Sequence, residues 1–76
     1  MIGNMVLVES SNINKVGFKL YEDVENGDLF VEYKSGTKYS YKNVPIKKYH
    51  EFIAAESKGR YMNSEIKNKY KYERIN

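Results

Sequence analysis

Three successive segments between residues 13 and 42 alternate apolar and polar side chains with a period of two. The apolar members fall on one face of each segment: Val16, Phe18 and Leu20 in the first, Leu29, Val31 and Tyr33 in the second, and Thr37, Tyr39 and Tyr41 in the third. Alternation of this kind is typical of strands that bury one face. Because polar connections separate the segments, the sequence predicts an antiparallel meander.

The register of the second turn follows from the same alternation. A two-residue loop would place Tyr33 opposite Lys38 and would mix the apolar and polar faces. A three-residue loop over residues 34–36 pairs Tyr33 with Thr37 and keeps the faces apart. The next pairs in this register are Val31 with Tyr39 and Leu29 with Tyr41. In such a turn we expect Gly36 to take the left-handed position of a glycine bulge.

Two further stretches flank the first of these strands. Met5–Val8 is a short apolar run that forms either an additional strand or a packed N-terminal arm. It is followed by Ser10-Ser11-Asn12, whose short polar side chains hydrogen-bond the local backbone and favour a turn. The connection over residues 22–28 contains Asn26-Gly27, a dipeptide that favours positive φ, so we expect the first hairpin to turn there.

After residue 43 the pattern becomes helical. Pro45 suits a first helical turn, and one helical face then carries Ile46, Tyr49, Phe52 and Ile53. Ser57 is expected to cap a second helix, whose apolar side is formed by Tyr61, Met62 and Ile66. Gly59 in its first turn suggests close approach of another backbone. The tail after residue 66 has no clean periodicity.

Strands followed by helices indicate an α+β fold. We expect a three- to four-stranded antiparallel meander sheet followed by two short helices packed on one face. Residues 1–76 are expected to form a single domain with its core over about residues 10–74.

Composition argues against catalysis and metal binding. The chain has no cysteine, and His50 is its only histidine. A Cys–His pair is therefore excluded, and a transition-metal site has too few ligands. The five glycines form no phosphate-binding loop. We expect no enzyme activity, no cofactor and no metal. No apolar run is long enough to span a membrane and no secretory signal is evident, so the expected compartment is the cytoplasm.

Charge is distributed unevenly along the chain. Residues 1–33 carry two lysines and six carboxylates, a net −4, whereas residues 34–76 carry eleven basic groups and four carboxylates, a net +7. Phosphates are bound by cations at intervals, and bases by flat rings between them. The helix start at Ser57 adds free backbone amides, which also suit an anion. The candidate nucleic-acid-binding residues are Lys58, Arg60, Tyr61, Lys67, Lys69, Tyr70, Lys71 and Tyr72.

Seven of the eight tyrosines divide between packing and contact. Four of them share faces with aliphatic residues and are expected in the core: Tyr33, Tyr39, Tyr41 and Tyr49. Tyr61 fits either role. Tyr70 and Tyr72 alternate with lysines and are the better contact candidates, although one of them could instead pin the tail to the sheet.

An ordered set of short motifs resembles the KTSC domain family, a module found at the C-terminus of some lysyl-tRNA synthetases and as free-standing small proteins. The matching residues are Ser10-Ser11-Asn12-Ile13, Tyr39-Ser40-Tyr41, Val44-Pro45, Ser57-Lys58-Gly59-Arg60-Tyr61, Asn63, Ile66, Tyr70 and Tyr72. The sequence departs from the family at Glu22-Asp23-Val24, where members often have an Asp-Pro turn. The family's function is not established, and RNA binding is a suggestion for it.

Two hypotheses about function follow. The first is a small non-enzymatic nucleic-acid-binding module, for RNA, without strong sequence specificity. The second is a protein-interaction or accessory module of a bacterial or phage protein that docks on an acidic partner. Both explain the basic surface, but only the first requires the tyrosines to stack. The oligomeric state is left open.

Overall fold

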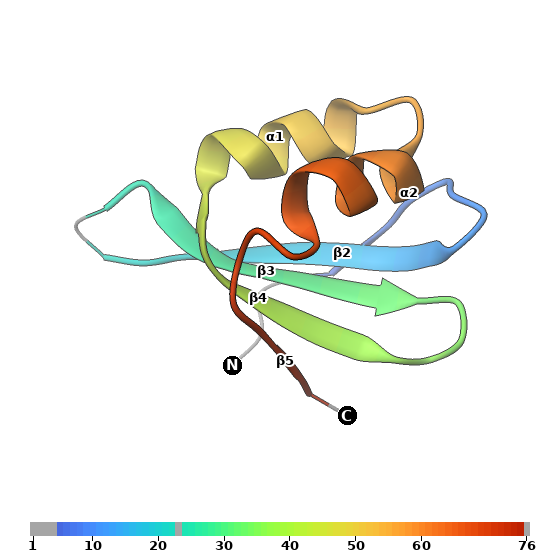
Figure 1. Ribbon diagram of the computed structural model, residues 1–76, viewed down its shortest axis with the longest axis horizontal. Helices are drawn as coiled ribbons and strands as arrows, with labels where there is room; N and C mark the ends of the chain where they lie inside the picture. The colour runs from blue at the N-terminus through green and yellow to red at the C-terminus, as the bar shows by residue number, and fades with distance from the viewer. Residues whose placement is uncertain (1–4, 23, 76) are drawn as a thin grey trace.

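The computed structural model describes residues 5–22 and 24–75 and has a five-stranded antiparallel sheet with helices on one face (Figure 1). The elements in chain order are β1 (Val6–Leu7), β2 (Ile13–Leu20), β3 (Asn26–Tyr33), β4 (Lys38–Pro45), α1 (Ile46–Ala54), α2 (Lys58–Tyr61), the π-helical turn η1 (Met62–Ile66) and β5 (Tyr72–Arg74). The spatial order of the strands is their sequence order. The predicted α+β meander is confirmed, with one strand more than the upper expected number.

The helices bury the apolar face of the sheet. Core side chains from the strands, α1 and η1 form one cluster: Ile13, Val16, Leu29, Val31, Tyr41, Val44, Phe52, Met62 and Ile66. Each is at most 3% exposed. The apolar stripes predicted for the two helices therefore do face the sheet, although Ile53 remains 39% exposed.

The predicted register of the β3–β4 turn is confirmed. Val31 lies opposite Tyr39 and Leu29 opposite Tyr41. The amide of Tyr33 donates to the carbonyl of Thr37 at 2.9 Å. Gly36 has φ of +94°, and a Cβ placed there would meet no atom of the residues that the structure describes within 4 Å. A side chain at this position would therefore be penalised by backbone strain and not by a clash.

The prediction for the first hairpin was wrong in its position. Asn26 and Gly27 lie inside β3, and the described part of the connection precedes them. Gly27 is needed for space, because a Cβ there would lie 2.2 Å from the carbonyl oxygen of Lys19 on the neighbouring strand. The Asn26-Gly27 dipeptide predicted a turn, but its glycine instead allows two strands to approach each other closely.

The prediction that another backbone approaches Gly59 closely was also wrong. Among the described residues no backbone approaches it closely, and a Cβ there would meet only the Asn12 side chain, at 3.7 Å. The cap at Ser57 is as predicted, since its Oγ accepts from the amide of Arg60 at 3.3 Å. The helix continues from α2 into η1, where the amide of Lys67 donates to the carbonyl of Met62 at 2.7 Å.

The two ends of the described chain add the outer strands. β1 pairs with β2, so the run at residues 5–8 contributes a strand. After η1 the chain turns at Asn68, whose φ is +68°, and runs along β4 as β5 (Figure 1). The tail, which has no clean periodicity in the sequence, therefore contributes a strand over Tyr72–Arg74. Three residues are too few for a period-two pattern to be visible in the sequence.

Candidate functional site

A pocket of about 600 Å³ opens on the helix-bearing face of the sheet. Three parts of the chain enclose it: the turn before β2, the β3–β4 hairpin and the segment between η1 and β5. The residues that line it are Ser11, Asn12, Tyr33, Lys34, Ser35, Thr37, Tyr39, Tyr41, Asn63, Lys67, Asn68 and Tyr72. We call it the tyrosine pocket. Its volume falls within the range of about 300–1,000 Å³ that is usual for small-molecule sites.

Four tyrosine rings from three strands form its aromatic wall. Tyr39 lies between two of them, with its ring edge-on to Tyr33 at 5.9 Å and to Tyr72 at 5.6 Å between centroids. Tyr41 lies 5.6 Å from Tyr72 and is buried. Tyr72 is 57% exposed, so part of one ring remains open to a ligand. Flat rings of this kind can stack on the π-face of another ring.

Local backbone geometry brings the three parts together. The Oγ of Ser10 accepts from the amides of Asn12 and Ile13 at 3.3 and 3.2 Å, which fixes the turn before β2. The carbonyl of Asn12 then accepts from the amide of Lys34 at 2.8 Å and ties this turn to the hairpin. On the other side, the left-handed residue Asn68 directs the tail from η1 onto the edge of β4.

The electrostatics of the pocket favour an anionic ligand. Lys34 and Lys67 line it, and neither makes a side-chain hydrogen bond or ion pair with another described residue. No aspartate or glutamate is among its lining residues. Burial, together with a hydrogen bond to Tyr33, raises the pKa of Tyr41 well above its ordinary value, so this phenol stays neutral.

Two shallower hollows adjoin the tyrosine pocket. One, of about 480 Å³, is lined by Ser11, Asn12, Ser57, Gly59, Arg60, Asn63 and Ser64, and we call it the arginine hollow. The other follows the tail and is lined by Asn68, Lys69, Tyr70, Lys71 and Tyr72. These two hollows also contain no carboxylate among their lining residues.

The predicted contact residues therefore separate into groups. Tyr72 and Lys67 line the tyrosine pocket, and Arg60 lines the arginine hollow. Lys69 and Lys71 are exposed along the tail. Tyr70 is half-buried and packs against the core, so it pins the tail as the alternative interpretation allowed.

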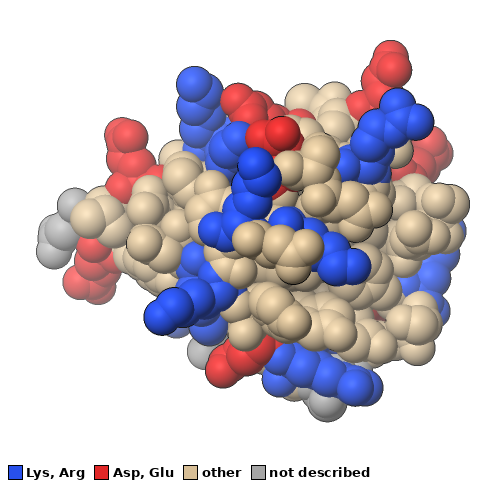
Figure 2. Space-filling model, in the orientation of Figure 1, with Lys and Arg blue, Asp and Glu red and all other residues tan. Residues whose placement is uncertain are grey.

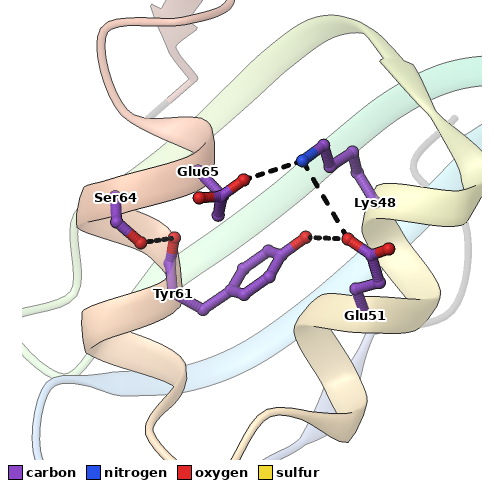
Figure 3. Close-up of polar contacts among 5 residues, drawn as sticks. All are labelled: Lys48, Glu51, Tyr61, Ser64 and Glu65. Atoms are coloured by element: carbon purple, nitrogen blue, oxygen red, sulfur yellow. Dashed lines mark hydrogen bonds and ion pairs between the residues drawn. The ribbon is translucent and has the colours of Figure 1, made fainter.

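Lys58 and Tyr61 are held in contacts within the protein. Lys58 Nζ donates to the carbonyl of Ala55 at 3.0 Å, close to the end of α1. The Tyr61 hydroxyl donates to Glu51 at 2.7 Å (Figure 3). Burial and this hydrogen bond raise the pKa of Tyr61 well above its ordinary value. Both side chains thus stabilise the packing of the helical segments.

Figure 3 shows polar contacts between α1 and the segment formed by α2 and η1. Lys48 on α1 lies 2.8 Å from Glu65 on η1 and 4.0 Å from Glu51. The bond from Lys48 lowers the pKa of Glu65. This lysine was not among the predicted site residues, and the contacts of its ammonium group lie within the protein.

Sequence reasoning missed much of the pocket. Tyr33, Tyr39 and Tyr41 were assigned to the core, and they do pack against it, yet the same residues line the pocket. Lys34 and Asn63 were not selected as contacts. The available signal was the set of short motifs, because Asn12, Asn63 and the two tyrosines of Tyr39-Ser40-Tyr41 all converge here.

Ion pairs with carboxylates neutralise part of the excess positive charge carried by residues 34–76. Lys38 lies 3.6 Å from Glu32, and Lys42 lies 3.5 Å from Asp28 and 3.7 Å from Glu73. Lys and Arg side chains are accordingly spread over the face seen in Figure 2, with acidic groups among them and at its edges. The cations that line the pockets, namely Lys34, Arg60, Lys67, Lys69 and Lys71, take part in none of these ion pairs.

The described residues contain no group of three or more His, Cys, Asp or Glu side chains that could hold a metal ion. His50 is exposed on α1, beside Tyr49. Within residues 5–22 and 24–75, no helix has the length and apolar character needed to cross a membrane.

Comparison with known proteins gives one consistent result. The sequence model of the KTSC domain family matches residues 9–70. The crystal structure of a KTSC domain protein from Yersinia pestis superposes with a TM-score of 0.86 at 29% identity, over 96% of this chain and 97% of that one. No curated protein matches the sequence.

Proposed function

The chain belongs to the KTSC domain family, and we propose that it is a small non-enzymatic module that binds single-stranded RNA through the tyrosine pocket and its neighbouring cations. The observation that supports this proposal is the composition of the pocket. A wall of aromatic rings, of which Tyr72 is largely exposed, and two lysines with no ion pair to another described residue occur together there, and no carboxylate lines it. Rings that stack on bases and cations that hold phosphates are the two requirements for binding a single strand.

A single strand fits this surface better than a duplex. The rings lie in a concave pocket, so only an unpaired base can reach their faces. Duplex RNA is recognised mostly through its backbone and 2′-hydroxyls across a wide groove. The single strand would place one base in the pocket and run its phosphates past Lys67, Lys69 and Lys71 along the tail.

The proposed roles follow from exposure and contacts. Lys34, Arg60, Lys67, Lys69 and Lys71 hold phosphates, and Tyr72 with Tyr39 stacks on a base. Lys58 and Tyr61 keep structural roles, because their polar groups already have partners. The module acts by binding in the cytoplasm and carries out no chemistry.

A titration with labelled single- and double-stranded RNA at two salt concentrations tests the proposal. The affinity for the single strand should fall with salt, with a log–log slope of about −0.7 per phosphate engaged. The variant Lys67→Glu, Lys71→Glu should lower the steepness of that slope by about 1.4, as expected for two lost contacts.

The matched control is Lys19→Glu, Lys47→Glu, which makes the same change in net charge at two exposed positions outside the pockets. Equal loss of affinity in both double variants would show that net charge alone, and not the position of the lysines, explains the effect. Absence of RNA binding at low salt would refute the proposal. An acidic peptide that binds as tightly as RNA of equal charge would favour the alternative, docking on an acidic protein.

A further inference from the structure

The tyrosine pocket and the arginine hollow are not separate features. Ser11, Asn12 and Asn63 line both of them, so the two spaces meet along these three side chains. Two come from the turn before β2 and one from η1. A ligand can therefore extend from the tyrosine rings to Arg60 without leaving the surface.

The two connected spaces differ in chemistry. The tyrosine pocket offers rings, neutral amides and the ammonium groups of Lys34 and Lys67, whereas the arginine hollow has no ring and is lined by Arg60 and small polar side chains. Arg60 is exposed, and its guanidinium has no hydrogen bond or ion pair with another described residue. A guanidinium with free donors is well suited to bidentate contact with a phosphate.

We propose that the connected spaces hold a single nucleotide, with its base among Tyr39, Tyr41 and Tyr72 and its phosphate at Arg60. This inference rests on the proposed function and specifies which unit of the strand the protein selects. The ribose then lies against Asn12 and Asn63 at the junction. Phosphates of neighbouring nucleotides continue toward Lys67 and the tail.

The pocket also has the means to distinguish bases. Asn12, Asn63 and Asn68 line it, and each carboxamide carries both donors and an acceptor. Amides that face a base edge form pairs of hydrogen bonds with one base and leave polar groups unpaired with another. Binding should therefore prefer one base at one position and remain indifferent along the tail.

The experiment compares two single-stranded RNAs of equal length and charge, one with bases throughout and one in which the nucleotides are abasic. The RNA with bases should bind about 5- to 150-fold more tightly, as stacking of one base predicts. Tyr72→Leu should abolish this difference, and Tyr72→Phe, which keeps the ring, should preserve it. Both variants change an exposed side chain and should stay folded.

A second arm uses the four nucleoside monophosphates, the nucleosides and inorganic phosphate, followed by NMR of the side-chain amides. The monophosphates should shift the signals of Asn12 and Asn63. Arg60→Gln should weaken the preferred monophosphate about tenfold while leaving the nucleoside unchanged. Lys47→Gln is the matched control for the lost charge.

The possible outcomes distinguish the single-nucleotide site from RNA binding in general. Equal binding of abasic and base-containing RNA would overturn the single-nucleotide site and leave RNA binding in place. Monophosphates that shift the amides of a protein that does not bind RNA would support the site and identify its ligand as a free nucleotide. Failure of both RNAs and all monophosphates to bind would overturn the inference and the proposed function together.

Discussion

The two faces of the sheet use the same residue types in opposite ways. On the face away from the helices, Glu32 accepts from Asn14 and lies near Lys38, and Lys42 lies between Asp28 and Glu73. On the helix-bearing face, the tyrosine pocket presents cations that no carboxylate neutralises within the described residues. Lysine stabilises the fold in the first case and is available to a ligand in the second.

The aromatic residues differ between the faces in the same manner. Phe30 lies on the outer face opposite Gly17 and is 6% exposed. Tyr21 on that side donates its hydroxyl to Asp28. Tyr72 on the inner face is mostly exposed. The difference teaches that the candidate surface in this chain is marked by unpaired cations that lie beside exposed rings, and not by the number of basic or aromatic residues.

Substitutions of Phe30 and of Tyr72 are expected to differ most in their effects on stability and on RNA affinity. Phe30→Ala removes a buried ring and should lower the free energy of unfolding by about 3 kcal/mol. Tyr72→Ala should change stability by less than about 1 kcal/mol but weaken RNA binding by about 1–3 kcal/mol. Chemical denaturation and RNA titration measure the two effects. Because Phe30→Ala could fail to fold, the milder Phe30→Leu serves for the binding measurement, and reduced affinity in it would break the comparison.

A lysine from each face gives the next contrast. Lys67→Glu should weaken RNA binding by about 2 kcal/mol, the value of a hydrogen bond from a charged group, with little change in stability. Lys42→Glu places three carboxylates together and should reduce stability by about 1 kcal/mol, with RNA affinity retained. The opposite pattern, with Lys42 governing affinity, would move the binding surface to the outer face.

The Tyr61 hydroxyl provides a smaller effect that separates packing from contact. Tyr61→Phe loses the hydrogen bond to Glu51 and should reduce the free energy of unfolding by about 1 kcal/mol. RNA affinity should not change, since the ring is kept and the hydroxyl lies between helices. Weaker binding without loss of stability would return Tyr61 to the candidate contacts.

The smallest effect concerns the dependence of stability on pH. The hydrogen bond from Asn14, with Lys38 nearby, lowers the pKa of Glu32 from its ordinary value of 4.5. A lowered pKa in the folded state contributes stability above pH 4.5 that is lost as pH falls through the folded value. Melting temperature should therefore decrease on acidification below pH 4.5, and less so in Glu32→Gln. At neutral pH that variant should bind RNA as the unmodified protein does.

Much of the fold could be predicted because its signals are local. The alternation before and after Gly36 determined the register of β3 and β4, and the helical stripe of Phe52 identified the buried face of α1. Gly27 could not be interpreted correctly, because its role depends on the carbonyl of Lys19, which lies across the sheet. β5 escaped notice since three residues give no periodic signal.

The site was predicted less completely for a physical reason. Arg60, Lys67 and Tyr72 were selected from their own neighbourhood in the sequence, and the structure places all three at the pockets. Lys34 carries no sign of its place in the pocket, and Asn12 and Asn63 are marked only by the short motifs, because each becomes a lining residue only when distant segments meet. Lys58 and Tyr61 looked identical to contact residues until their partners were known.

The sequence by itself determined the antiparallel meander, the two apolar helical stripes and the identity of the family, because strand alternation, helical spacing and short motifs are properties of neighbouring residues. Only the tertiary structure decided which cations remain without partners and which rings enclose a space. Ion pairs and pockets form between segments far apart in the chain, and their existence depends on how the sheet, the helices and the tail pack together.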